Sequence, residues 1–204
     1  QSYRSLSMFP VGCGMVSLPR PLLLTLLGLT VLYACAFTYS VVLQLAGSEG
    51  LLFANGTPVG GDFINLWSMG RLVLGGDLSP IYRPDAFVAY EHTIIDADIG
   101  IRLWAYPPQS LLMFWPLAFL PFYPALVLWS ALGLGVLGFG ARRLGFGKLE
   151  ALLIVVSPAS LACLYYGQTA NVAVGLLLLA LSARRPVDRL SVLSAVLLTF
   201  KPQI

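Results

Sequence analysis

The chain has 204 residues, of which 58% are hydrophobic and only 10% are charged, with a formal net charge of +3 at pH 7. Soluble domains carry about 25% charged residues, so a chain this poor in charge cannot cover a water-facing surface and must face lipid. Its basic residues form small clusters between apolar runs, which excludes a single basic face for nucleic acid. The three cysteines, Cys13, Cys35 and Cys163, show neither a disulfide framework nor a zinc-ligand spacing.

Five apolar segments predict membrane-spanning helices, because about 20 apolar residues at 1.5 Å each cross a bilayer. These segments are 21–45, 124–141, 149–165, 170–183 and 190–204. The range 107–121, interrupted by Pro116 and Pro121, predicts a short interfacial or re-entrant helix, with a tight hairpin of two crossings as the alternative. We interpret 1–204 as one transmembrane domain, and we expect it to be the N-terminal part of a longer protein, because its last apolar segment lacks a terminating signal.

The basic clusters between these segments predict the orientation, since short loops rich in arginine and lysine stay in the cytoplasm. The clusters are Arg142, Arg143 and Lys148, and then Arg184, Arg185 and Arg189. With the N-terminus inside and 109–141 crossing once, both clusters lie in the cytoplasm and 46–106 forms an outer loop. This loop holds seven of the nine acidic residues. We therefore expect a multi-pass protein of the cell's inner (plasma) membrane whose functional site is on the outer, periplasmic face.

An amphipathic helix is predicted within the outer loop, over 60–75. At helical spacing, Trp67, Arg71 and Leu74 share one face, and the glycine pair ending at Gly76 stops the helix. Such a helix suits the membrane surface, with the Trp67 indole at the level of the headgroups.

Short motifs follow one another in a fixed order from about residue 21 to the end of the sequence. They are Gly61-Asp62-Phe63, Trp67, Gly70-Arg71, Gly76-Asp77, Ile81-Tyr82, Pro84, Trp104, Tyr106-Pro107-Pro108, Ser157-Pro158, Gly167-Gln168 and Phe200-Lys201-Pro202-Gln203. In this order and spacing the chain resembles glycosyltransferase family 87. The resemblance implies an all-α, polytopic transmembrane fold, namely a GT-C-like helical bundle whose outer loop carries interfacial helices.

The same resemblance implies an inverting transfer of a hexose or pentose, with mannose as the first choice. The donor would be a polyprenyl-phosphate sugar, and the acceptor an envelope glycan or glycolipid. The expected partners are these two substrates and the lipid bilayer, with no nucleic acid. No glycine-rich phosphate loop is present, which agrees with a lipid-linked donor. We expect no cofactor and name no metal ligands, and the sequence does not report metal dependence.

Asp62 is the candidate catalytic residue. Inverting transfer needs a general base beside the acceptor hydroxyl, and a carboxylate suits that role. The family pattern places such an acid early in the first outer loop, which by position and motif is Asp62. The alternative is structural, because an aspartate that follows two glycines is also a good helix N-cap.

Two cations are candidates for binding the donor phosphate, which needs positive charge or backbone donors. Lys201 lies in an apolar segment near the predicted outer end of that segment. A charged side chain is costly there and therefore indicates a function. The alternative for Lys201 is a side chain that reaches toward the lipid headgroups. Arg71 is the second candidate, and its alternative is a surface residue that stacks near Trp67 or touches lipid phosphate.

Five further residues are candidates for substrate binding: Gln168, Asp77, Tyr82, Trp104 and Tyr106. Gln168 lies in a charge-free turn, where it either donates a hydrogen bond to the sugar or phosphate or is an ordinary turn residue. Asp77 either binds an acceptor hydroxyl or closes a turn. The three aromatic residues either stack on sugars and line a lipid groove or belong to the interfacial aromatic belt.

Two other classes of function fit parts of the pattern. A transporter would carry ionisable residues within its spans, whereas here the polar residues gather on one membrane face. A non-catalytic membrane assembly subunit would keep the helical bundle but would not catalyse sugar transfer. Both remain alternatives to the transferase at this stage.

Overall fold

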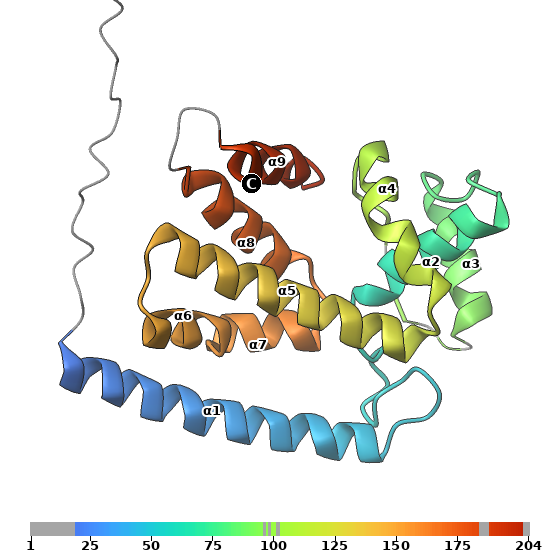
Figure 1. The fold of residues 1–204 in the computed structure, drawn as a ribbon. Coiled ribbons are helices and arrows are strands. Elements are labelled where there is room, and N and C mark those ends of the chain that lie inside the picture. Colours follow the sequence, from blue (N-terminus) through green and yellow to red (C-terminus); the bar gives the residue numbers. More distant parts are fainter. Residues whose placement is uncertain (1–18, 96, 98, 101–102, 184–187, 202–204) are drawn as a thin grey trace, which may run out of the picture.

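The computed structural model describes residues 19–95, 97, 99–100, 103–183 and 188–201. Within these ranges the chain forms the α-helices α1 to α9 and two short 3-10 helices, η1 and η2, without a strand (Figure 1). The predicted all-α fold class is therefore confirmed. The predictions that involve Cys13, Arg184, Arg185, Pro202 and Gln203 concern positions outside the described residues.

Two described helices, α1 (Arg20–Ala46) and α5 (Phe122–Leu144), are each long and apolar enough to cross a membrane. The predicted spans 21–45 and 124–141 lie within them, and their crossing stays a prediction. None of the residues of α1 is buried, so its apolar surface faces the surroundings of the bundle, which suits lipid. α5 follows Pro121 and ends where Gly145 adopts the left-handed conformation of a helix C-cap.

The predicted span 149–165 is divided into α6 (Lys148–Val155) and α7 (Pro158–Tyr165), which are bent by 41°. Proline has no N–H and clashes with a preceding helical turn, so Pro158 ends one helix and starts the next. The Ser157 side chain caps α7 by accepting a hydrogen bond from the Ser160 N–H at 3.3 Å. The pair is either one broken span or a re-entrant loop.

The last two predicted spans, 170–183 and 190–204, contain shorter helices than expected. α8 (Ala170–Leu181) has 12 residues and α9 (Arg189–Leu198) has 10. At 1.5 Å per residue they are about 18 and 15 Å long, against a hydrocarbon core of about 30 Å. In the part of the chain that the structure describes, two helices, or three with the bent pair as one, are long enough to cross, whereas the sequence predicted five.

The outer loop contains two helices, α2 (Phe63–Gly75) and α3 (Pro84–Ile94). α2 buries most of its apolar side chains in the core of the molecule, and the predicted face with Arg71 and Leu74 remains exposed. Gly76 follows the helix with a φ of 76°, so the predicted stop is found. α2 is therefore a core helix with one exposed edge.

The range 107–121 contains three short pieces instead of one helix. They are η1 (Pro108–Ser110), α4 (Leu111–Phe114) and η2 (Trp115–Phe119). Pro116 lies inside this range and Pro121 directly precedes α5, so no continuous helix forms. α4 and η2 pack on α2, and η1 packs on α4.

α5 and α8 cross at glycines. A Cβ on Gly140 would lie 2.6 Å from the Gly175 carbonyl oxygen, and a Cβ on Gly175 would lie 2.6 Å from the Leu137 nitrogen. Small residues allow two helix backbones to approach this closely, as is common in membrane bundles. Further along the crossing, a Cβ on Gly133 would lie 3.3 Å from the Cβ of Asn171. The crossing therefore fixes the start of α8, and with it the turn between α7 and α8.

Candidate active site

The candidate site forms where the loop 60–62 packs against the turn 166–168. The Asp62 N–H donates to the Tyr166 carbonyl oxygen at 2.7 Å. A Cβ on Gly61 would lie 2.7 Å from that same oxygen, and a Cβ on Gly167 would collide with the Gly60 carbonyl oxygen. Gly61 and Gly167 also have positive φ angles of 44° and 57°, which only glycine adopts at little cost. Two motifs far apart in sequence thus fit together because each contributes a glycine.

The Asp62 carboxylate lies exposed at this contact. Asp62 occupies the N-cap position of α2, but its side chain makes no capping hydrogen bond. One partner of the carboxylate is the Gln168 side chain, whose Nε2 donates to Oδ2 at 3.5 Å from 106 positions away. The capping alternative therefore does not describe this side chain, which is directed to the turn between α7 and α8.

Tyr106 reaches the same turn from the segment before η1. Its hydroxyl lies 3.2 Å from the hydroxyl of Thr169, a residue that is 2% exposed. Burial raises the pKa of Tyr106, the hydrogen bond to Thr169 lowers it, and the negative charge of Asp62 raises it. The net direction is upward, so the phenol stays neutral at physiological pH.

Lys201 is brought to the same end of the molecule by its neighbour Phe200. The Phe200 ring packs 6.2 Å from the Tyr106 ring and 5.5 Å from the Phe114 ring. Lys201 is half-buried, and its ammonium forms no ion pair with another described residue. The packing of Phe200 on Tyr106 therefore brings position 201 toward the end of the bundle that carries Asp62, and the role of Lys201 stays a prediction.

Arg71 lies away from this group. Its guanidinium carbon is 5.6 Å from the centre of the Trp67 ring, which is the geometry of a cation–π contact. The Trp67 indole N–H donates to the Leu120 carbonyl oxygen at 3.0 Å. Arg71 therefore matches the stacked surface residue that was its alternative, and its binding of donor phosphate stays a prediction.

Asp77 organises a turn. Its Oδ1 accepts hydrogen bonds from the Ser79 N–H at 3.0 Å and the Ser79 hydroxyl at 2.7 Å. Both hydrogen bonds lower the pKa of Asp77. This arrangement matches the turn alternative. In the structure the Asp77 carboxylate is bound to Ser79 and the Asp62 carboxylate to Gln168, so the two belong to different contacts.

Tyr82 and Trp104 support Tyr106. The Tyr82 hydroxyl donates to the Tyr106 carbonyl oxygen at 3.1 Å. The Trp104 ring lies 4.9 Å from the Tyr106 ring and 6.0 Å from the Phe114 ring, and Trp104 is 6% exposed. Sugar stacking on Trp104 needs an exposed ring face, which this packing does not provide. Both residues act on the site through Tyr106 in this structure.

Sequence reasoning missed several polar residues that shape the site. Thr169 is one, and a buried pair below the turn is another. The Ser160 hydroxyl donates to Asn171 Oδ1 at 3.1 Å, and Asn171 Nδ2 donates to the Ser160 carbonyl oxygen at 3.1 Å. Glu91 of α3 is fully buried as well. The sequence signal for these residues was their isolation within apolar helices. A polar side chain is buried only where it finds a hydrogen-bond partner, so such a position indicates a buried polar contact.

The described residues contain no group of three histidine, cysteine, aspartate or glutamate side chains that could hold a metal ion. The family model of glycosyltransferase family 87 matches residues 104–204. The match confirms the resemblance over the part of the chain that carries Tyr106, Gln168 and Lys201. The motif around Asp62 precedes the matched range. No curated protein and no solved structure matches the chain.

Proposed function

We propose, with membership of glycosyltransferase family 87 through residues 104–204 as the premise, that this chain transfers a sugar from a polyprenyl-phosphate donor. The acceptor would be a hydroxyl group of an envelope glycan or glycolipid, and the transfer would invert the anomeric centre. The family makes the protein a glycosyltransferase, and α1 and α5 suit a membrane. The proposal rests mainly on the position of the Asp62 carboxylate beside Gln168, at the end of the bundle toward which Phe200, the neighbour of Lys201, packs on Tyr106.

The chemistry follows from these two charges. The Asp62 carboxylate accepts the proton of the acceptor hydroxyl while that oxygen forms a bond to the anomeric carbon of the donor. The bond from the anomeric carbon to the phosphate oxygen breaks, and its electron pair leaves with the polyprenyl phosphate. Lys201 stabilises the negative charge that develops on this leaving group.

Gln168 and Tyr106 position the base. The amide of Gln168 is neutral, so its long hydrogen bond of 3.5 Å orients the Asp62 carboxylate without neutralising its charge. The Tyr106 hydroxyl, through its contact with Thr169, fixes the segment before η1 against the same turn. The base and its supports therefore belong to three segments, two of which meet at the glycine contact and the third through Tyr106 and Thr169.

The direction of α5 supports a location of the candidate site on the outer side of the membrane. Phe122, its first residue, packs 5.4 Å from the ring of Phe63, the neighbour of Asp62. Arg142 and Arg143 lie in the last turn, about 30 Å away at 1.5 Å per residue. If this basic end is cytoplasmic, as the positive-inside rule predicts, the site lies outside. Mannose remains the first choice for the sugar on the family resemblance.

An assay of sugar transfer tests this proposal. The full chain in lipid nanodiscs would be given radiolabelled mannosyl and arabinosyl polyprenyl phosphates with a mixture of envelope glycolipids. We expect a labelled product whose anomeric configuration is opposite to that of the donor. A folded protein that transfers neither sugar would contradict the proposal and favour an assembly subunit. Movement of the labelled lipid between leaflets without transfer would instead favour a transporter.

A further inference from the structure

Two asparagine side chains are buried among the described residues, and they differ in their hydrogen bonds. Asn171 on α8 has both sides of its amide satisfied by Ser160, whose hydroxyl donates to Oδ1 and whose carbonyl oxygen accepts from Nδ2, each at 3.1 Å. Asn65 on α2 is 9% exposed, and its Oδ1 is buried without a hydrogen-bond partner in the described part of the chain. Burying an unpaired amide costs free energy, so the partner of Asn65 comes from outside these residues, as water or as a bound ligand.

Asn65 lies one helical turn after the candidate base. The Asn65 N–H donates to the Asp62 carbonyl oxygen at 3.1 Å, and the backbone of Asp62 has the angles of a right-handed helix. Side chains three residues apart on a helix lie on the same side, with about 5–6 Å between their Cβ atoms. The exposed Asp62 carboxylate and the Asn65 amide are therefore neighbours on one side of α2.

This pair of side chains suits a sugar that has two adjacent hydroxyl groups. An ionised aspartate only accepts hydrogen bonds, whereas an asparagine amide both donates and accepts them, as a hydroxyl group does. The proposed reaction brings one acceptor hydroxyl to the Asp62 carboxylate. The hydroxyl on the adjacent ring carbon is then close enough to donate to Asn65 Oδ1, and this hydrogen bond would satisfy the buried oxygen.

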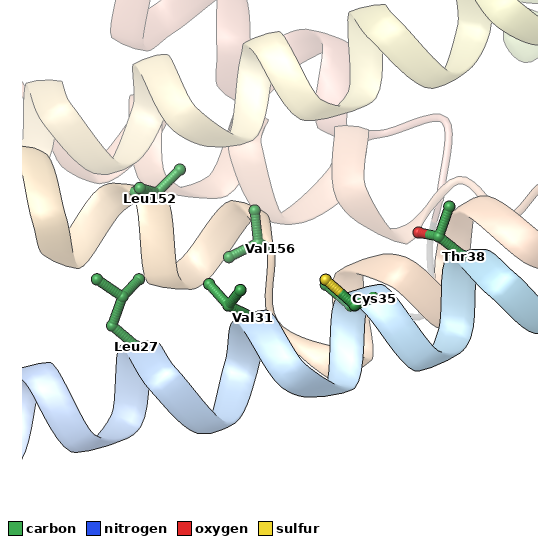
Figure 2. A pocket seen from close by; sticks show the side chains of 7 residues that line it. Leu27, Val31, Cys35, Thr38, Leu152 and Val156 are labelled. Carbon is green, nitrogen blue, oxygen red and sulfur yellow. The ribbon is translucent and has the colours of Figure 1, made fainter.

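Other features of the molecule lack this combination. Ser68 on α2 also buries an oxygen without a partner, but it is 0% exposed and lies about 120° around the helix from Asp62, so a substrate at Asp62 does not reach it. The open depression between α1 and α6 is lined by apolar side chains apart from Cys35 and Thr38, and it therefore offers little to a sugar (Figure 2).

We propose that Asn65 is a substrate-binding residue that holds the acceptor through the hydroxyl group adjacent to the attacking oxygen. This inference rests on the proposed function and deepens it by naming the class of acceptor, a sugar ring with two adjacent free hydroxyl groups of which one reacts. A lipid alcohol with a single hydroxyl group would leave Asn65 unpaired. Because the amide is neutral, it binds the acceptor without removing the negative charge that Asp62 uses to accept the proton.

Thermal unfolding of the full chain in nanodiscs tests whether the Asn65 amide stabilises the fold. Asn65→Leu removes an unpaired amide and keeps a similar volume, so this variant should unfold at the wild-type temperature or above. Asn171→Leu is the matched comparison. It breaks two hydrogen bonds to Ser160 and should unfold at a lower temperature. Equal losses in the two variants would overturn the proposal, because Asn65 would then have a structural partner such as a buried water.

Transfer kinetics with the mixture of envelope glycolipids test the role of Asn65 in binding. At saturating donor, Asn65→Leu should raise the KM for the acceptor about tenfold, which is the effect of losing one hydrogen bond, while the KM for the donor stays unchanged. Ser68→Ala is the control on the same helix and should keep both values. Octyl α-mannoside and its monodeoxy analogues then identify the hydroxyl group. The wild-type protein should use one analogue about tenfold less well than the parent, and Asn65→Leu should not discriminate between the two.

The possible results separate this inference from the proposed function. An unchanged acceptor KM in a folded Asn65→Leu protein would overturn the role of Asn65 and leave the proposed transfer standing. A rise in the KM for the donor alone would overturn it in favour of a contact with the donor. If the wild-type protein transfers no sugar to any acceptor, the proposed function fails and this inference fails with it.

Discussion

The two ends of α5 use charged residues in different ways. At its last turn, Arg143 donates to Asp188 at 2.5 Å and to the Ser182 hydroxyl at 3.1 Å, and Asp188 also caps α9. At its first turn, where the candidate site lies, Asp62 meets the neutral Gln168 at 3.5 Å, and Lys201 forms no ion pair with a described residue. One end uses opposite charges to join helices, while the other end leaves an ammonium for an anionic ligand.

The site end must therefore be held together by other means. The contact between 60–62 and 166–168 depends on backbone fit through Gly61 and Gly167, and the aromatic rings around Phe114 pack behind it. Backbone fit and ring packing therefore join the segments at this end, where Lys201 forms no ion pair with a described residue. Substitutions at the two ends should accordingly separate stability from activity.

The largest effect on stability is expected from Gly167→Ala. The new Cβ would collide with the Gly60 carbonyl oxygen, and the φ of 57° disfavours any side chain. Together these effects should cost about 3 kcal/mol of unfolding free energy and abolish transfer. Gly56→Ala is the control, because its φ of 77° carries the same backbone strain with open space around the Cβ. Thermal unfolding in detergent measures both, and equal losses would contradict the role of the contact.

Lys201→Gln should come next, acting on activity. Loss of a charge-assisted hydrogen bond to phosphate is worth about 2 kcal/mol, which raises the KM for the donor or lowers kcat by about 30-fold. Lys148→Gln, an exposed lysine that begins α6, serves as the control. If Lys201→Gln keeps wild-type kinetics and Arg71→Gln loses them, Arg71 is the cation that binds the donor phosphate.

Arg143→Met should show the opposite behaviour at the other end of α5. Removing one partner of the pair with Asp188 should cost about 2 kcal/mol, less than for a fully buried pair, because the two side chains are 22% and 12% exposed. Transfer per folded molecule should stay unchanged. Arg142→Met is the matched control, since Arg142 bonds only the Phe146 carbonyl oxygen among described residues. A loss of transfer in Arg143→Met with normal stability would contradict the separation of the two ends.

The smallest effect is expected from Thr169→Val, which removes the hydrogen bond to Tyr106 while keeping the side-chain shape. We expect a loss of about 1 kcal/mol in unfolding free energy. A double-mutant cycle with Tyr106→Phe measures the pair itself, and additive losses would show that the two hydroxyls do not interact in the folded protein.

The sequence predicted local features better than contacts. The apolar runs 21–45 and 124–141 lie within α1 and α5. α2 ends before Gly76, as the glycine pair in the sequence predicted. Spacing along the chain could not show that Gly61 and Gly167 face each other, because that contact joins segments about 100 residues apart. The sequence also did not show that Trp104 is buried, because an aromatic residue suits a sugar site, a membrane interface and a core equally well.

The lengths of the later helices show a second limit. Apolar composition over 149–165 suggests one span, but the N-cap geometry of Ser157 and Pro158 divides it. The family pattern selected Asp62, and the predicted depth in the membrane selected Gln168 and Lys201. The fold joins Asp62 to Gln168 and packs Phe200, the neighbour of Lys201, on Tyr106. Their roles in catalysis stay predictions until activity is measured.

The central claim is that the Asp62 carboxylate is the base of the transfer reaction. The most direct measurement compares transfer by Asp62→Asn with transfer by Asp77→Asn, an exposed aspartate of the same outer loop whose carboxylate accepts hydrogen bonds from Ser79 in a turn. Asp62→Asn should fold normally and lower kcat by at least about 100-fold, as expected for loss of a general base, while Asp77→Asn keeps kcat. Wild-type kcat in a folded Asp62→Asn protein would contradict the account.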